Sequence, residues 1–81
     1  MPIKNLRPDL EKKLIRYGLK DKFIKAKKLF EENPRYPGLH TEILKPKQYG
    51  VFSFRLDRKF RALFIVVDGN AEITDINLHY Q

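Results

Sequence analysis

Apolar residues in the N-terminal half of the chain recur at the spacing of amphipathic helices. The repeating positions are Leu10, Leu14, Tyr17, Phe23, Ala26 and Phe30. This pattern predicts one helix over residues 8 to 17, ended by Gly18, and a second over residues 20 to 32, ended by Asn33-Pro34. The opposite face of the second helix carries lysines, namely Lys22, Lys25 and Lys28, which are interpreted as a solvated helix surface.

The C-terminal half instead alternates between apolar and polar residues, as strands do. The expected strands cover about 39 to 44, 50 to 56, 60 to 67 and 71 to 78. The connections between them are short and rich in turn-forming residues, for example Asp68-Gly69-Asn70. Connections this short force neighbouring strands to be antiparallel. The sequence therefore predicts an antiparallel sheet of about four strands.

The alternation divides the expected sheet into two faces of different character. One face is apolar and should receive the two helices; its residues are Phe52, Phe54, Leu56, Ala62, Phe64, Val66, Thr74, Ile76 and Leu78. The other face includes Ser53, Leu63, Ile73 and Asp75, and ends in a polar corner of Arg55, Arg61, Asn77 and His79. Glu42 and Leu44 are two residues apart, so their side chains should face the same side of the strand. Because one is charged and the other is apolar, the pattern leaves the direction of the Glu42 side chain open. An apolar groove is also expected beside the helices.

Composition restricts the class of protein. The chain has 81 residues, which predicts a single domain over residues 1 to 81. It has no cysteine and no apolar run near the roughly 18 residues that span a bilayer, and its N-terminus lacks a secretory signal, so we expect a cytoplasmic protein. The 17 Lys and Arg outnumber the 10 Asp and Glu and give a net charge of +7. This charge favours a nucleic acid, an acidic inhibitor protein or the ribosome as partner.

Four polar residues could together cleave a phosphodiester without a metal: Glu42, Arg61, His79 and Tyr80. They offer a base, a charge clamp and an acid. Each also has a structural interpretation: Glu42 as a solvated carboxylate, Arg61 as one partner of an ion pair with Asp75 or Glu42, His79 as a surface histidine, and Tyr80 as an aromatic cap on the core. The histidines and carboxylates do not form a convincing metal-ligand set, so no metal and no cofactor are expected.

Basic residues surround the turns near this candidate site. They are Lys45, Lys47, Arg55, Arg58 and Lys59. Such side chains could bind RNA phosphates or simply keep the surface soluble, and of the five Lys45 is expected to come nearest the scissile phosphate. His40 is interpreted as structural or solvated.

Several separated segments resemble one family. The run 37–45, the segment 50–55, Phe60-Arg61-Ala62 and the terminal His79-Tyr80 resemble the RelE/ParE toxin superfamily, and most closely its YoeB-like mRNA interferases. The resemblance implies an α+β fold with two N-terminal helices on one face of a small antiparallel sheet. Because the segment before the first helix is short, the N-terminal edge strand is expected to be absent or only a stub over residues 3 to 6.

The resemblance also implies a function. Such proteins are toxins of type II toxin–antitoxin systems that cut mRNA on the ribosome by attack of the 2′-hydroxyl, leaving a 2′,3′-cyclic phosphate. Glu42 would then be the general base, Arg61 the phosphate clamp and His79 the general acid, with Tyr80 positioning the substrate or the acid. The expected partners are a cognate antitoxin and mRNA on the ribosome, with no membrane and no direct DNA binding without the antitoxin. Two alternatives stay open: a ParE-like gyrase inhibitor, or a decayed relative that only binds its antitoxin.

Overall fold

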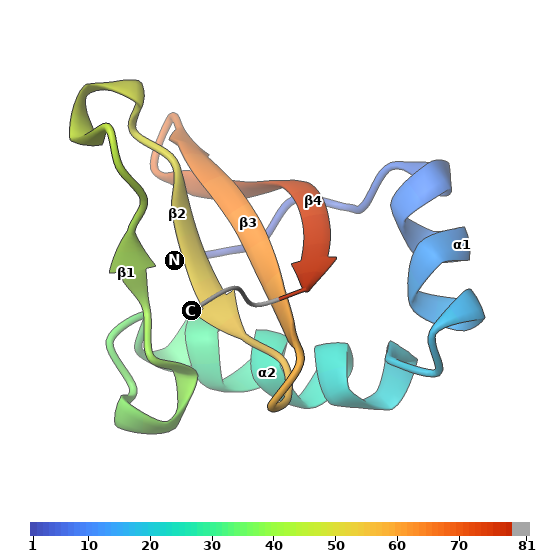
Figure 1. Cartoon of the computed structure of the whole chain (residues 1–81). Helices are drawn as coiled ribbons and strands as arrows, with labels where there is room; N and C mark the ends of the chain where they lie inside the picture. Colours follow the sequence, from blue (N-terminus) through green and yellow to red (C-terminus); the bar gives the residue numbers. More distant parts are fainter. Residues whose placement is uncertain (79–81) are drawn as a thin grey trace.

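The computed structural model describes residues 1–78, which form two helices and a four-stranded antiparallel sheet (Figure 1). In chain order the elements are α1 (Pro8–Arg16), α2 (Lys20–Glu32), the 3₁₀ turn η1 (Pro37–Leu39), β1 (Glu42–Ile43), the 3₁₀ turn η2 (Lys47–Tyr49), β2 (Phe52–Arg55), β3 (Phe60–Val67) and β4 (Asn70–Leu78). Both helices lie within a residue of their predicted bounds. The predicted α+β class and the four strands are confirmed.

The sheet follows the sequence, in the order β1-β2-β3-β4, with every neighbouring pair antiparallel. The longest pairing is the hairpin of β3 and β4, which turns through Asp68 and Gly69. Both residues have positive φ, 51° and 79°. This is the conformation that a two-residue hairpin turn requires and that an Asp-Gly sequence favours.

The N-terminal segment adds only a stub to the sheet, as predicted. Ile3 forms a single parallel bridge with Ala71, at the start of β4. The Lys4 amide donates to the Ala71 carbonyl at 2.9 Å, and the Ala71 amide donates to the Pro2 carbonyl at 2.8 Å. The Ile3 amide donates to Oε2 of Glu31 at 2.8 Å, which ties the stub to the end of α2.

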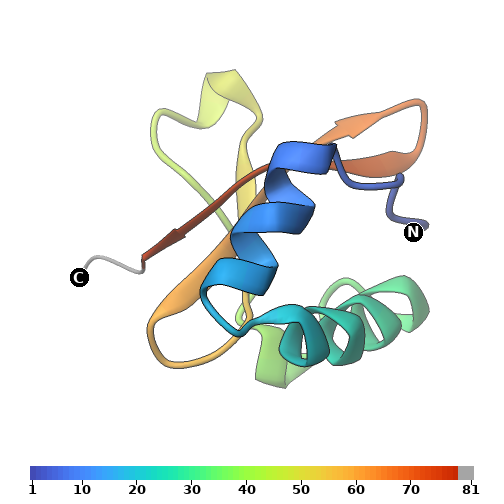
Figure 2. The same cartoon turned by 90° about the vertical axis from the view of Figure 1, so that its right-hand side faces the viewer.

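The apolar core lies between the helices and one face of the sheet. Figure 2 shows α1 and α2 on the same side of the sheet, and α1 packs against β4. Phe30 from α2 is fully buried; its ring stacks on Phe54 at 4.9 Å and meets Phe64 edge-on at 5.0 Å. The buried apolar residues are Ile3, Leu10, Leu14, Leu19, Phe23, Ala26, Phe30, Leu39, Phe54, Ala62, Phe64, Ala71, Ile73 and Ile76.

The first expected strand is much shorter than predicted. Of residues 39 to 44 only Glu42 and Ile43 are in a strand, because Leu39 ends a 3₁₀ turn and His40 has a left-handed φ of 46°. Leu39 is nevertheless buried, so its apolar character is satisfied by a turn rather than by a strand. The second strand is also shorter, Phe52–Arg55 instead of residues 50 to 56.

The side-chain directions predicted for β4 were wrong at the centre of the strand. Leu63 pairs with Asp75 while Phe64 pairs with Ile73, so Thr74 is an extra residue in a β-bulge. The bulge reverses the alternation before Thr74. Ile73, expected on the open face, is therefore 3% exposed in the core, and Thr74 does not take the core position expected of it. Val66 and Leu78, also expected in the core, remain exposed.

Candidate functional site

A hollow of about 230 Å³ lies on the open face of the sheet. Its lining comes from all four strands and the β1–β2 connection: Glu42, Leu44, Ser53, Arg61, Leu63, Asn77 and Leu78. The register explains the gathering, because Glu42 pairs with Ser53 across β1 and β2, and Arg61 pairs with Asn77 across β3 and β4. Alternating residues of paired strands share one face.

Arg61 is a buried cation in this hollow, with only 5% of its surface exposed. Its Nε donates to Oγ of Ser53 at 3.0 Å, and its Nη2 donates to the carbonyl oxygen of His40. Burial lowers the pKa of Arg61; the Glu42 carboxylate opposes this shift and the neighbouring Arg55 adds to it. An arginine still keeps its proton at neutral pH, so the hollow contains a fixed positive charge.

Glu42 provides the negative charge of the site. Its Oε1 lies 3.3 Å from Nη1 of Arg61, and its side chain is 55% exposed. The carboxylate is therefore anchored to the buried guanidinium while remaining open to solvent. The sequence left two ion-pair partners open for Arg61, and the structure has Glu42. Asp75 instead pairs with Lys13 of α1 at 3.0 Å.

The other two predicted catalytic residues, His79 and Tyr80, lie outside the described residues. The described chain stops at the end of β4, where Leu78 lines the hollow. The roles predicted for His79 and Tyr80 stay predictions.

Solved structures resemble the whole of this chain. A YoeB/ParE toxin from Agrobacterium tumefaciens matches 99% of this chain and 100% of its own, with a TM-score of 0.72 and 19% identity. A copper-bound mutant toxin from Helicobacter pylori matches 98% and 96%, with a TM-score of 0.71 and 20% identity. A YoeB-YefM complex from Staphylococcus aureus matches 99% and 100%, with a TM-score of 0.62 and 21% identity. The chain has the fold of the YoeB/ParE toxins.

This likeness confirms the fold that the sequence resemblance implied. No family model matches the chain, and no curated protein matches it either. At about one residue in five identical, the YoeB/ParE likeness defines the fold, whereas the chemistry depends on this chain's own side chains.

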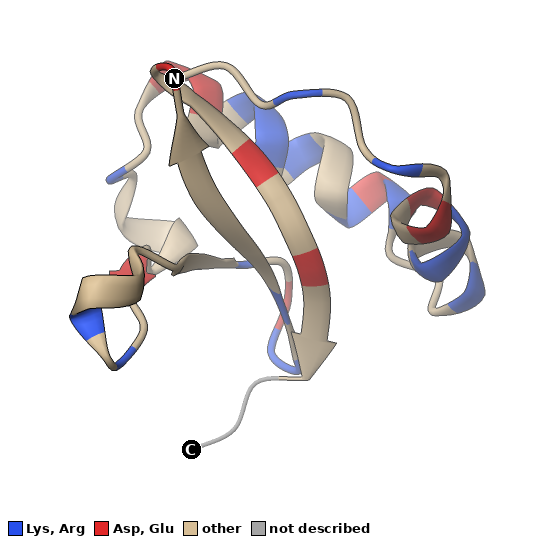
Figure 3. Cartoon of the chain, turned by 90° about the horizontal axis from the view of Figure 1, so that it is seen from above, with Lys and Arg blue, Asp and Glu red and all other residues tan. Residues whose placement is uncertain are grey.

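The five predicted RNA-binding residues do not form one cluster on the YoeB/ParE-like fold. Lys45 and Lys47 lie exposed in the connection before β2, whereas Arg55, Arg58 and Lys59 lie at its other end, in or beside the turn to β3. Figure 3, in which Lys and Arg are blue, shows basic residues in both of these connections, which lie apart from each other. None of the five lines the hollow that contains Arg61.

Ser53 is the site residue that sequence reasoning did not assign a role. It is completely buried, and its hydroxyl oxygen accepts the Nε–H of Arg61. The available signal was the expectation that Ser53 and Arg61 face the same side of adjacent strands. A buried hydroxyl next to a buried cation needs that hydrogen bond, because each group would otherwise lose its water without replacement.

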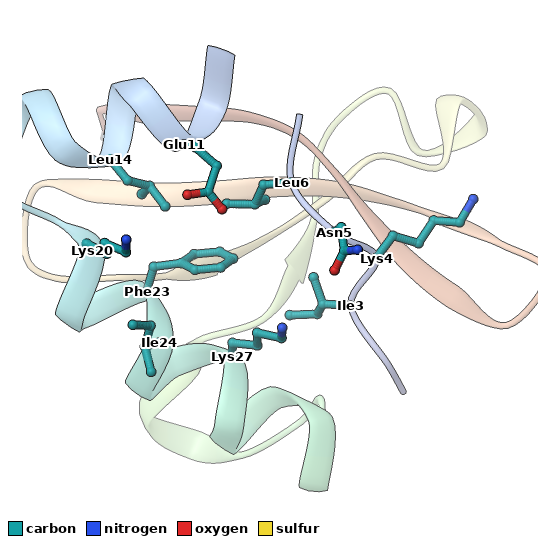
Figure 4. Close-up of a pocket in the computed structure, with 10 residues that line it drawn as sticks. All are labelled: Ile3, Lys4, Asn5, Leu6, Glu11, Leu14, Lys20, Phe23, Ile24 and Lys27. Atoms are coloured by element: carbon teal, nitrogen blue, oxygen red, sulfur yellow. The ribbon is translucent and has the colours of Figure 1, made fainter. Parts of the chain in front are cut away.

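A different hollow, of about 300 Å³, opens between the two helices and the N-terminal stub (Figure 4). Leu14 and Phe23 point into it, and Lys20, Lys27 and Glu11 lie around it. None of the charged residues in its lining is buried, whereas the open-face hollow contains the buried Arg61 paired with Glu42. The open-face hollow is the better candidate for chemistry.

Two further features of residues 1–78 concern metal ions and membranes. Within residues 1–78 no three or more His, Asp or Glu side chains gather as they would around a metal ion. The helices in the same range are too short or too polar to cross a bilayer.

Proposed function

We propose that this chain is the toxin of a type II toxin–antitoxin pair and that it cuts mRNA on the ribosome without a metal. The observation that carries the proposal is the Glu42–Arg61 pair, at 3.3 Å, in a hollow on the open face of the sheet. The YoeB/ParE fold supports the toxin role, and the net charge of +7 supports an RNA substrate.

The proposed reaction uses the nucleophile that RNA itself supplies. Glu42 takes the proton of a 2′-hydroxyl, whose oxygen attacks the adjacent phosphorus and forms the 2′,3′-cyclic phosphate. The bond from phosphorus to the 5′-oxygen breaks, and His79 gives that oxygen its proton. Arg61 stabilises the extra negative charge on the phosphorane, and Tyr80 orients the substrate or the acid.

The burial of Arg61 fits this role in one physical respect. Its guanidinium is already oriented by Ser53 and by the His40 carbonyl, so little reorganisation is needed when charge develops on the phosphate. Glu42 is the exposed partner of the pair and the one that can move. An entering phosphate would compete with Glu42 for Arg61 and leave the carboxylate free to act as a base.

The same burial also favours a second candidate function. Arg61 bonded to Ser53, His40 and Glu42 has the contacts of an arginine that stabilises the fold. A toxin that arrests growth by binding a protein target, as ParE-like gyrase inhibitors do, would need this arginine only for structure. It would need no base.

One pair of variants separates the two candidates. E42Q keeps the size and polarity of the side chain but removes the base, and E32Q makes the same change on the exposed end of α2. For the nuclease we expect E42Q to reduce mRNA cleavage by about 10²- to 10⁴-fold, with E32Q unchanged. Cleavage is read by primer extension on messages from cells and from a translation extract, with and without ribosomes. Growth arrest that survives in E42Q and is accompanied by DNA-damage signalling would favour the gyrase-binding candidate.

The substrate itself provides a second test of the mechanism. A single 2′-deoxy substitution at the cut site removes the nucleophile and should block cleavage there, while neighbouring sites remain sensitive. Cleavage at the deoxy position would refute 2′-hydroxyl attack.

The proposed antitoxin needs a surface, and the helix side of β1 has one. A hollow of about 630 Å³ there is lined mainly by apolar side chains, including Ile43, Phe52, Phe64 and the exposed Val66. An apolar segment of the antitoxin would bury them. Co-expression with the reading frame next to this gene should restore growth and yield a stable complex, and V66E should weaken that complex.

A further inference from the structure

A hollow rich in basic residues, called here the basic hollow, lies at the end of β2 that leads into the turn to β3. It measures about 310 Å³ and is lined by Lys22, Lys25, Ala26 and Leu29 of α2, Gly38 and Leu39 of η1, and Arg55, Leu56 and Asp57. Three of these side chains are cationic and one is anionic, so the hollow has an excess of positive charge. Its apolar floor includes the buried Ala26 and Leu39.

Arg55 is the unusual member of this lining. Its Nε is buried and has no hydrogen-bond partner among residues 1–78. A buried donor on a charged group that lacks an acceptor is costly, and most such groups in native proteins have one. The fork of a guanidinium matches the oxygens of a phosphate, so a turn of the Arg55 side chain into the hollow would give this donor a phosphate acceptor.

A second observation also points to an anion. Arg55 and Arg61 are direct cross-strand partners on β2 and β3, so two guanidinium side chains start from opposite positions on one face. Like charges opposite each other are destabilising, and the proximity of Arg55 contributes to the lowered pKa of Arg61, after burial. An anion bound at Arg55 would relieve this repulsion.

The lysines of the hollow are arranged to add to this site. Lys22 is fixed by Asp57, with Nζ 3.0 Å from Oδ2, while Oδ1 of Asp57 accepts the amides of Lys59 and Phe60 at 2.8 Å. Lys25, one turn further along α2, is exposed and forms no ion pair within the described chain. It can therefore turn toward an anion without breaking another contact.

We propose that Arg55, with Lys25 and Lys22, binds a phosphate of the RNA strand next to the one held at Arg61. This inference rests on the proposed nuclease function and extends it to a second subsite. The strand would then leave the Glu42–Arg61 hollow on the open face and pass the turn between β2 and β3 to reach the α2 side chains. Lys22 and Lys25, expected to be only solvated, belong to the substrate surface.

The test is binding of a short, fluorescein-labelled 2′-O-methyl oligonucleotide, which cannot be cleaved because it has no free 2′-hydroxyl. Anisotropy titrations at several salt concentrations compare the wild type with R55Q, R55K and K25Q. K28Q is the matched control, because Lys28 is exposed on the same helix and loses the same charge without lining the hollow. Thermal melts of every variant check that the fold is intact.

We expect affinity to fall about tenfold in R55Q and about threefold in K25Q, with K28Q near the wild type. R55K keeps the charge but loses the fork, so it should fall between the wild type and R55Q. The slope of log affinity against log salt should decrease by about 0.7 in R55Q, as for one lost phosphate contact on a single strand.

Equal losses in R55Q, K25Q and K28Q would mean that only net charge matters and would overturn the subsite. Unchanged affinity in R55Q would overturn it as well. Loss of ribosome binding in R55Q without loss of oligonucleotide binding would place the phosphate in ribosomal RNA and overturn the assignment to the substrate strand. These outcomes can be told apart from those for catalysis. Loss of cleavage in E42Q together with normal binding in R55Q would support the nuclease function and overturn the subsite. Weakened binding in R55Q together with full cleavage in E42Q would support the subsite and overturn the nuclease function.

Discussion

Replacing Ser53 with alanine tests whether the site is held together by the buried hydrogen bond to Arg61. The change removes only one oxygen, so the lost packing is small. It leaves the Nε–H of a guanidinium that is 5% exposed without its acceptor at 3.0 Å. An unsatisfied buried donor costs about 1–3 kcal/mol, and a charged one lies toward the upper end of that range.

We therefore expect S53A to lower the free energy of unfolding by about 2 kcal/mol, measured by urea denaturation. For a domain of this size the same loss corresponds to a fall in Tm of about 8–16 °C. T74V is the matched control, since it removes a hydroxyl whose bond to the Leu63 carbonyl is long, at 3.4 Å, and involves no charge. It should cost less than about 1 kcal/mol.

A double-mutant cycle makes the test specific to this contact. In an R61L background there is no buried Nε–H to satisfy, so adding S53A should cost less than about 0.5 kcal/mol. The coupling between the two positions would then be about 1.5 kcal/mol. An S53A protein as stable as the wild type, or an equal loss in the presence of R61L, would refute a stabilising role for the hydrogen bond between Ser53 and Arg61.

Three further predictions concern the scaffold. Burial would raise the pKa of Asp57, but backbone amides, led by that of Phe60, and the Lys22 ammonium together lower it. The stabilising contribution of the Asp57 carboxylate is therefore present above about pH 4 and is lost as the pH falls further. In urea titrations, the stability advantage of the wild type over D57N should shrink between about pH 5 and pH 2. Phe54 is fully buried against Phe30, so F54A should lose about 3–5 kcal/mol and show little folded signal by circular dichroism at room temperature; a cooperative melt near that of wild type would contradict this. Gly69 has φ of 79°, so G69A should lower stability by about 1–2 kcal/mol, whereas G38A, at a position without a positive φ, should be close to neutral.

The sequence predicted the elements whose periodic pattern agrees with their packing. Both helices and β3 lie where their apolar residues placed them, and the Asp68-Gly69 turn has the geometry that its residues favour. The bulge in β4 was missed because the residues from Ile73 to Asp75 fit either face locally. Its trace in the sequence is the three-residue interval between Ile73 and Ile76, both of which are buried. An alternating strand cannot put both on one face without an extra residue.

The candidate site was predictable only as far as strand parity and family resemblance extend. Parity put Arg61 on the open face, and the resemblance added Glu42, which the structure places 3.3 Å from it. Parity could not indicate that Arg61 is buried, since that depends on the left-handed turn at His40, which brings a backbone carbonyl over the guanidinium. The separation of the basic residues follows from their positions before and after β2 along the chain.

The register of β2 against β3 connects everything proposed for the open face. It places Arg55 opposite Arg61 and puts Ser53 within reach of the Arg61 Nε. A slip by one residue would turn Arg61 toward the phenylalanine core and leave neither a clamp nor a second phosphate site. Asp57 opposes such a slip, because its carboxylate holds the amides of the connecting turn while its other oxygen binds Lys22. The carboxylate of Asp57 is therefore more than an unfavourable charge in the basic hollow. It fixes the turn between β2 and β3, and this turn sets the register that aligns Arg55 with Arg61.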